Sequence, residues 1–464
     1  MTGPRSSSAR SGRWRPSPPV RAGAREVGSR AWTPLLRALV LLGLLALTCC
    51  AAPDPRPVDL DAIAVRRDTR EASPAIPARD GLTLEAARDL LPVLDPELQL
   101  AFARELPALA GREYAGLWPD PSLNVDLADA LSGGALDELD VLLQVPLAVA
   151  GRQAALADRL DAEARLAVAR ARRQVFERAR QLEADWVEWT LALAEERSNR
   201  RLAADLQGPL QRVEVLVESG NLGQVESGLL RLARIDAERR AVAASQRARD
   251  LELRLLHSLG LRAGGPVAFV PLQLGDELEE PAGAVDRALP ELVAAAAALE
   301  VAEAEVQVAH RARFVQPRLG AGAGREGGGR RLLFGLQVPL PLWNRGLGAL
   351  ARAVASREVA ARTLELAFER ALEREERARR ALRSARARRA PVEATLLPLA
   401  AEQERVLSEL LDLGDLRPFL LVEAMERRQA AELDRLRLLG EEHVAGMELE
   451  ALLAPPGSNE ERER

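Results

Sequence analysis

The sequence contains the same unit twice, and this internal repeat limits the possible fold more than any other feature. The repeated segments are LQVPL at 143–147 and 336–340, PSL and PRL at 121–123 and 317–319, and SGNL and LGDL at 219–222 and 413–416. The three pairs are separated by 193 to 196 residues, which is nearly one constant offset. A constant offset indicates a duplicated structural unit, so elements found in one half are expected in the other.

Each half contains, in the same order, a moderate helix, two short strands, a very long helix, a tight turn and a returning helix. The predicted fold class is mainly α with a small β part, built as two αββα repeats with long antiparallel coiled-coil hairpins. We divide the chain into a signal peptide (1–50), a proline-rich linker (51–81), a first repeat (82–260), a connector (261–284), a second repeat (285–453) and a disordered tail (454–464).

The strands are predicted from alternation of apolar and polar residues. Leu123, Val125 and Leu127 alternate with Asn124 and Asp126, as expected for a strand with one apolar face. A glycine-rich break separates the two strands of each repeat, which predicts two hairpins. The four predicted strands lie at about 122–127, 139–145, 318–324 and 332–338.

The long helix of the first repeat is predicted from apolar residues that recur between 156 and 193 at a mean spacing of about 3.7 residues. The stripe is narrow, which favours helices paired side by side as in a coiled coil. Residues 151–219 would extend for roughly 100 Å as a helix. Gly208 and Pro209 are expected to kink it near its far end.

The second repeat has the corresponding long segment at 346–413, where Pro391 and Pro398 are expected to interrupt the helix. Both long segments end at a glycine, Gly220 in the first repeat and Gly414 in the second. Glycine adopts positive φ without steric cost and commonly ends helices. We therefore predict a helix-turn tip near residue 220 and another near residue 414.

Composition and motifs exclude several classes of function. The 64 basic and 69 acidic residues give a net charge of −5, whereas a nucleic-acid binder normally has a basic surplus. The three histidines, His257, His310 and His443, are too scattered for a metal site. No Ser/His/Asp or Cys/His arrangement is present, so we expect neither catalytic residues nor a cofactor.

The N-terminal region is predicted to direct export. Residues 38–47 are uncharged and apolar, too few to span a bilayer but typical of a signal peptide. The end of this run, Leu47-Thr48-Cys49-Cys50, resembles a bacterial lipobox, in which a cysteine is lipidated. We predict lipidation at Cys50 or Cys49; the alternative is an ordinary secretion signal.

Neither repeat is expected to fold alone. A two-stranded hairpin is marginally stable, and four strands in one chain leave two open edges. Assembly of several copies would close the strands into a barrel and the helical hairpins into a tube. In lipid, closed barrels satisfy every backbone polar group. Export, short strands and obligate assembly therefore indicate an outer-membrane barrel extended by a helical tube.

Over about residues 82–453 the sequence resembles the TolC-type outer membrane efflux proteins. The resemblance rests on the segments LTLEAA at 82–87, WPDPSL at 118–123, QVPL at 144–147 and LPLWNRG at 340–346, together with the two glycine-centred tips. The last segment is similar to the heavy-metal, CzcC/CusC-like branch of that family.

The resemblance implies a homotrimer in the cell outer membrane, lipid-anchored and extending into the periplasm. Each chain would contribute four strands to a 12-stranded barrel and its helices to a periplasmic tunnel. The implied partners are a periplasmic adaptor (membrane fusion protein) and an inner-membrane pump, more plausibly of the RND than of the ABC type. The implied function is the exit duct of a tripartite efflux system, conducting passively and without chemistry of its own.

Three groups of candidate site residues follow from this resemblance. Residues that would contact the adaptor lie at the tips: Gly220, Asn221, Leu222, Gly414, Asp415 and Leu416. Acidic residues that threefold symmetry would arrange as carboxylate rings at the tunnel mouth are Glu226 and Glu423, although solvated helix charges are the simpler interpretation. Aromatic residues of a membrane girdle would be Trp118, Phe314, Phe334 and Trp343.

Two rival functions remain open at this point. The same channel could serve type I protein secretion, and its transported substrate is not indicated by any residue pattern. A periplasmic coiled-coil scaffold or adaptor without a barrel is a different class. The strand hairpins distinguish the two classes, because a scaffold has no need of an apolar β-sheet.

Overall fold

The computed structural model describes residues 58–63, 65, 81–128, 138–149, 151–220, 222–262, 267–275, 279–326, 329–340, 342–413 and 418–453. The chain divides into two compact units, Met1–Ile63 and Ala64–Arg464. In the first unit, the Asp59 carboxylate accepts hydrogen bonds from the backbone N–H groups of Asp61 and Ala62, at 2.9 and 3.2 Å. All elements described below belong to the second unit.

The first repeat begins with two helices rather than the single helix expected. Helix α3 (Leu84–Leu94) ends at Asp95, and α4 (Pro96–Glu113) begins at the next residue. Asp95 caps α4 by accepting hydrogen bonds from the N–H groups of Glu97 and Leu98. Proline at the first helical position completes this start signal, so a second helix begins there.

The long segment of the first repeat forms α5 (Arg152–Asp205) and α6 (Gln207–Glu218), followed after the turn by α7 (Gln224–Ser258). The break between α5 and α6 lies at Leu206, just before the predicted Gly208–Pro209 kink. Pro209 has no N–H to donate to the carbonyl of Asp205, four residues earlier, so the regular helix ends there.

The second repeat follows the same plan, with α8 (Pro290–Arg311), α9 (Leu347–Pro391), a π-helical turn η1 (Val392–Leu396), α10 (Leu397–Asp412) and α11 (Pro418–Leu453). The interruption predicted at Pro391 and Pro398 is the π-helical turn between them. It widens the helix in front of Pro398, whose ring would otherwise clash with the carbonyl of Ala394.

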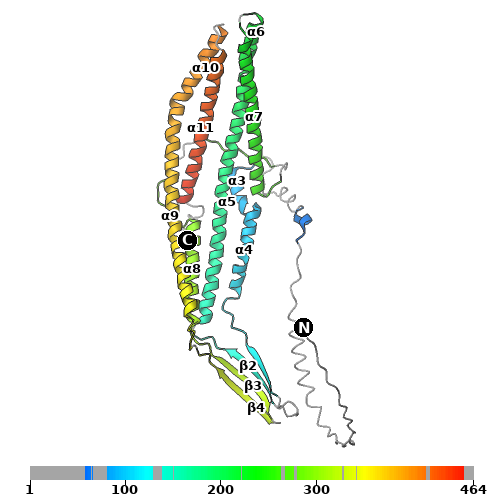
Figure 1. Ribbon diagram of the computed structural model, residues 1–464, viewed down its shortest axis with the longest axis vertical. Helices are drawn as coiled ribbons and strands as arrows, with labels where there is room; N and C mark the ends of the chain where they lie inside the picture. Colours follow the sequence, from blue (N-terminus) through cyan, green and yellow to red (C-terminus); the bar gives the residue numbers. More distant parts are fainter. Residues whose placement is uncertain are drawn as a thin grey trace, which may run out of the picture. The chain divides into compact units, whose positions relative to one another are not determined.

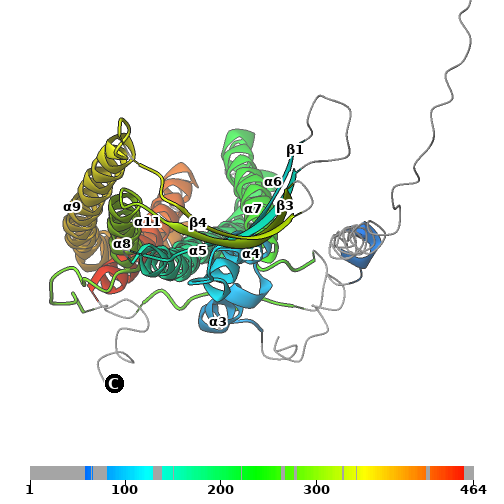
Figure 2. The same ribbon diagram turned by 90° about the horizontal axis from the view of Figure 1, so that it is seen from below.

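The four strands form one antiparallel sheet in the order β1-β2-β3-β4: β1 (Ser122–Ala128), β2 (Glu138–Pro146), β3 (Arg318–Glu326) and β4 (Gly329–Gln337). The pairing of β2 with β3 joins the two repeats. Figure 2 shows that the sheet is curved, and Figure 1 places it at one end of the long helices. The predicted fold class is thus confirmed.

The helices form two antiparallel hairpins that pack against each other. Helix α5 contacts its hairpin partner α7 and also α4, α8 and α11, while α9 contacts α8 and α11 (Figure 1). The buried positions are mostly alanine and leucine, as a narrow seam between helices requires. The sparse aromatic content of the sequence is sufficient for this kind of core.

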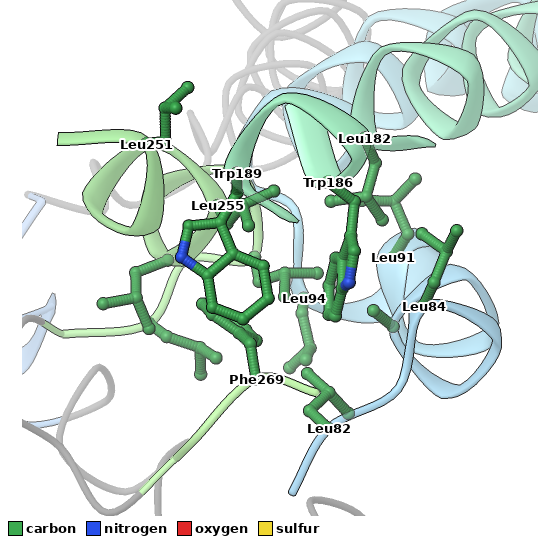
Figure 3. Close-up of a cluster of buried hydrophobic side chains, with 14 of the residues drawn as sticks. Leu82, Leu84, Leu91, Leu94, Leu182, Trp186, Trp189, Leu251, Leu255 and Phe269 are labelled. Atoms are coloured by element: carbon green, nitrogen blue, oxygen red, sulfur yellow. The ribbon is translucent and has the colours of Figure 1, made fainter. Parts of the chain in front are cut away.

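The largest hydrophobic core lies where α3, α5 and α7 meet the connector, and we call this region the waist (Figure 3). Trp186 is fully buried there, edge-on to Trp189 and to Phe269 at ring-centroid distances of 6.0 and 5.0 Å. The Trp186 indole N–H donates to the carbonyl of Val270 at 2.9 Å. The connector is therefore a packed part of the core and not only a spacer.

Candidate functional site

One face of the sheet is apolar and exposed. Because side chains alternate along each strand, the register places residues from all four strands in rows on this face. We define the apolar face by three rows: Val145, Leu319 and Leu336; Leu123, Leu143, Ala321 and Phe334; and Val125, Val141, Ala323 and Leu332. Phe334, in the middle row, is 82% exposed, so none of the described residues covers its side chain.

The opposite face of the sheet, the polar face, contains an ion cluster around Arg331. The Arg331 guanidinium bonds both oxygens of Asp140, at 2.7 and 3.3 Å, and also contacts Glu138 and Glu326. Glycine makes this arrangement possible, because a Cβ at Gly324 would lie 2.0 Å from a carboxylate oxygen of Asp140. The two faces thus have opposite chemistry.

The sheet has two open edges. Within the described residues β1 pairs only with β2, and β4 pairs only with β3. Each outer strand therefore presents a row of backbone N–H and C=O groups that the chain itself does not use. An open edge beside an exposed apolar face is a surface suited to pairing with another chain.

The aromatic residues predicted for a membrane girdle do not lie at one level. Trp118 and Phe314 immediately precede β1 and β3, and Trp343 follows β4, so these three lie at the helical end of the sheet. All three are exposed, Trp343 at 91%. Phe334 instead lies within the middle row of the apolar face.

Two helical stripes of apolar side chains are also left uncovered. The first is on α7 and the second runs along η1 and α10 to the end of that segment. Their members recur at spacings of three, four or seven residues, as in a coiled-coil seam. The first stripe comprises Val225, Leu229, Leu232, Ile235 and Val242 on α7. The second comprises Leu396 of η1, Leu399, Val406 and Leu410 of α10, and Leu413, the residue that follows α10.

The first tip is described in the structure, except for Asn221. Gly220 has a φ of +77°, the left-handed conformation expected for a helix-ending glycine. Leu222 packs against the apolar cluster between the tip helices and is partly buried. Glu226 lies in the first turn of α7, where its carboxylate folds back over Gly223. A negative charge is stabilised there by the helix dipole.

The second tip contains Gly414, Asp415 and Leu416, which lie outside the described residues, as do Cys49 and Cys50. Glu423 is described and lies in the second turn of α11. Its carboxylate pairs with Arg427 one turn later, at 2.6 Å. This pairing with Arg427 offsets part of the negative charge that Glu423 would present.

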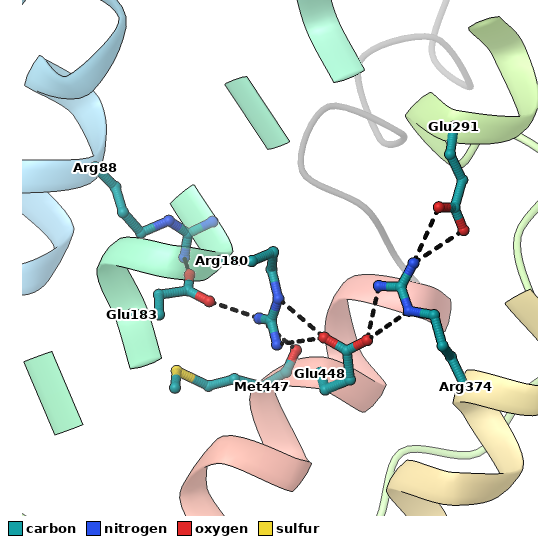
Figure 4. Close-up of polar contacts among 7 residues, drawn as sticks. All are labelled: Arg88, Arg180, Glu183, Glu291, Arg374, Met447 and Glu448. Atoms are coloured by element: carbon teal, nitrogen blue, oxygen red, sulfur yellow. Dashed lines mark hydrogen bonds and ion pairs between the residues drawn. The ribbon is translucent and has the colours of Figure 1, made fainter. Parts of the chain in front are cut away.

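A continuous chain of ion pairs crosses the helices beside the waist (Figure 4). It runs through five helices in the order Arg88 (α3), Glu183 and Arg180 (α5), Glu448 (α11), Arg374 (α9) and Glu291 (α8), with successive N–O distances of 3.0, 2.5, 2.8, 2.7 and 3.0 Å. This chain of ion pairs joins both repeats, and the sequence alone did not indicate which arginines and glutamates would pair.

The two central carboxylates of this chain are shifted in opposite directions. Burial raises the pKa of Glu183 and outweighs the attraction of Arg180 and Arg88. Burial acts on Glu448 as well, but Arg374 and Arg180 outweigh it and hold the pKa of that carboxyl below its usual value. Glu448 is shared by Arg180 of the first repeat and Arg374 of the second, so it links the two repeats within this chain of ion pairs.

Within the described ranges, no group of three or more His, Cys, Asp or Glu side chains is placed to hold a metal ion. In the same part of the chain, none of the helices combines the length and the apolar character that crossing a bilayer requires.

Two antiparallel helical hairpins joined to one two-faced, four-stranded sheet define the fold of the outer-membrane channels. Among solved structures, CusC matches over 80% of this chain and 91% of its own, with 17% identity and a TM-score of 0.67. The CmeC outer membrane channel of Campylobacter jejuni matches over 82% and 88%, with 13% identity and a TM-score of 0.69. VceC, an outer membrane protein of Vibrio cholerae, matches over 80% and 95%, with 14% identity and a TM-score of 0.66.

These three similarities establish the fold of the chain at low sequence identity. The sequence itself matches no protein-family model and no curated protein.

Proposed function

We propose that the protein is an outer-membrane channel that acts as the exit duct of a tripartite efflux system. The observation that carries this proposal is the two-faced sheet: an exposed apolar face, a charged opposite face and two open edges. An apolar exterior with a polar interior is the pattern of a water-filled barrel in lipid. A periplasmic scaffold would gain nothing from an exposed apolar sheet and would risk aggregation.

The height of the apolar face suits such a barrel. On β2 the apolar residues of this side continue one row past the apolar face, from Val145 to Leu139, and these six residues advance about 20 Å at roughly 3.4 Å per residue. An outer-membrane barrel presents an apolar band about 25 Å tall. Exposed Trp118 and Trp343 lie beyond the row of Val145, where an interface with lipid headgroups would begin.

The open edges and the uncovered helical stripes support assembly as a homotrimer. Pairing of β4 with β1 of a neighbouring copy would close both edges, and three copies of four strands give a 12-stranded barrel. The same arrangement would bring the α7 stripe of one copy against the α10 stripe of the next. One symmetric assembly would then pair the open sheet edges and also bury the two helical stripes.

In this proposal the helical hairpins form a periplasmic tunnel, and the tips at Gly220–Leu222 and Gly414–Leu416 contact a periplasmic adaptor. An inner-membrane pump, of the RND type, supplies the energy, and the channel conducts passively without catalysing a reaction. Lipidation at Cys50 or Cys49 anchors the mature chain. The similarity in fold to solved outer membrane channels such as CmeC supports the membrane assignment.

Reconstitution of the purified full-length protein in planar bilayers tests the proposal. We expect discrete conductance steps, together with outer-membrane fractionation and heat-modifiable β-structure. Disulfide cross-linking between Leu232→Cys and Leu399→Cys on different copies should trap a trimer if the helical stripes meet. A soluble, monomeric periplasmic protein without conductance would overturn the proposal.

A further inference from the structure

Two arginines lie directly opposite each other on the same side of the sheet as the apolar face. Arg325 of β3 is the cross-strand partner of Arg330 of β4, and Leu139 of β2 is the neighbour of Arg325 in the same row. Both arginines are exposed. Neither makes an ion pair with any residue that the structure describes, in contrast to Arg331, which points to the other side and contacts three carboxylates.

This arrangement is unfavourable without a further partner. Like charges at directly opposed positions of a sheet repel each other and destabilise the pairing. The nearby carboxylates of Glu138, Asp140 and Glu326 are on the polar face, where Arg331 already binds them. Among the described residues on their own face of the sheet, the two guanidinium groups therefore have no counter-charge, and together they form a cationic site.

The position of the pair indicates the kind of anion. Arg325 and Arg330 form the next row beyond Leu332, at the hairpin end of the sheet, about 14 Å along β4 from Phe334 at roughly 3.4 Å per residue. Arginine at the border of an apolar band extends its charged end to the level of the lipid headgroups. Two adjacent guanidinium groups match the planar, bidentate recognition of phosphate oxygens.

We propose that Arg325 and Arg330 together bind a phosphate group of an anionic lipid headgroup at the hairpin end of the sheet. The inference deepens the proposed function and rests on its placement of the sheet in a membrane. The bound phosphate would also remove the cross-strand repulsion, so the lipid stabilises the β3–β4 hairpin.

Binding is measured on the full-length protein in zwitterionic detergent, with diphosphorylated lipid A as the probe. The test variant is Arg325→Gln with Arg330→Gln, and the matched control is Arg318→Gln. Arg318 is an exposed arginine of the same strand, at the opposite end and on the polar face. Because one arginine near an anionic surface contributes about fivefold in affinity, we expect the double variant to bind about 25-fold more weakly. The control should bind as the wild type does.

A second readout separates lipid binding from a structural role of the arginines. Without anionic lipid, the double variant should unfold at the same or a higher temperature than the wild type, because the repulsion is gone. With lipid A, only the wild type and the Arg318→Gln control should gain thermal stability. Equal lipid A affinity in wild type and double variant would overturn the inference, as would equally tight binding of inorganic phosphate alone.

Conductance of the same preparations in phosphatidylcholine bilayers distinguishes this inference from the proposed function. A wild type that conducts but binds lipid A no better than the double variant overturns the arginine site alone. A wild type that never conducts overturns the proposed function, while binding in detergent still reports on the arginine pair.

Discussion

The waist and the sheet of this molecule differ in packing. The waist is fully packed within one chain, whereas the sheet has an exposed apolar face. At the waist, Trp186 is fully buried and its indole N–H has a backbone acceptor. In the sheet, Phe334 is 82% exposed and both outer strands lack a partner on one side. The waist is therefore built to hold the chain together, whereas the sheet is built to be covered by something outside the chain.

This difference leads to a general expectation. Substitutions at the waist should lower the free energy of unfolding of the chain itself. Substitutions on the apolar face should leave that free energy nearly unchanged and act on insertion or assembly. The predictions below test this separation in order of decreasing effect.

The largest effect is expected for Trp186→Ala. Removing a fully buried indole from a packed core costs about 4 kcal/mol, and the carbonyl of Val270 would also lose its donor. Urea unfolding of the full-length protein in detergent, followed by helical circular dichroism, measures this loss. Trp343→Ala is the matched control, because Trp343 is exposed and its removal should change the unfolding free energy by less than about 0.5 kcal/mol. Similar losses in both variants would contradict the division between waist and sheet.

The next largest effect is expected on the free energy of membrane insertion. The experiment compares substitutions at two neighbouring positions of β4. Phe334→Arg places a charge in the middle row of the apolar face, which should cost about 3 kcal/mol of insertion free energy. Leu333→Arg places the same charge on the polar face and should cost much less. The fraction of protein recovered in the outer membrane reports the difference. Equal recovery of the two variants would show that the apolar face does not contact lipid.

Much of this architecture could be predicted from the sequence, because periodicity determines which residues lie on the same side of a helix or strand. The alternation of Leu123 and Val125 correctly predicts β1, and Gly220 correctly predicts the turn at the first tip, whereas the turn at Gly414 lies outside the described residues. The division of the first helix was missed, although Asp95 and Pro96 form a recognisable start signal, because the apolar pattern continues across it.

The ion cluster of the sheet and the ion chain beside the waist could not be predicted. Arg331 is separated from Asp140 by 191 residues, and only the register of β2 against β3 and of β3 against β4 brings them together. Arg180 and Glu448 belong to different repeats and meet through the packing of α5 against α11. Sequence patterns describe one element at a time, whereas these contacts depend on how elements pack.

A smaller, pH-dependent effect is expected at the ion chain. Glu448→Gln removes a carboxylate shared by Arg180 and Arg374 and should cost about 2 kcal/mol at neutral pH. Because the pKa of Glu448 is lowered in the folded state, its contribution is complete above the ordinary value of 4.5 and is lost as pH falls through the folded value. The stability difference between wild type and variant should therefore vanish in acid. Unfolding measurements from pH 7 to pH 3 test this.

Glu183→Gln is the control for that experiment, with the opposite slope. The pKa of Glu183 is raised in the folded state, so the folded protein binds a proton more readily than the unfolded chain. Relative to this variant, the wild type should gain stability as pH falls through the raised value. Parallel pH profiles for the two variants would show that the carboxylates do not differ in environment as described.

The smallest effect is expected at Glu423, which the proposed function places at a tunnel mouth. Glu423 is paired with Arg427, and an exposed pair of this spacing contributes about 0.4 kcal/mol. Glu423→Gln should therefore hardly change the stability of the chain and should reduce cation selectivity only modestly. Arg427→Gln is the sharper experiment, because it frees three carboxylates of a trimer at once and should increase cation selectivity. Reversal potentials in a salt gradient measure both variants. If neither substitution changes the reversal potential, Glu423 is a solvated helix charge, and other residues determine the ion selectivity.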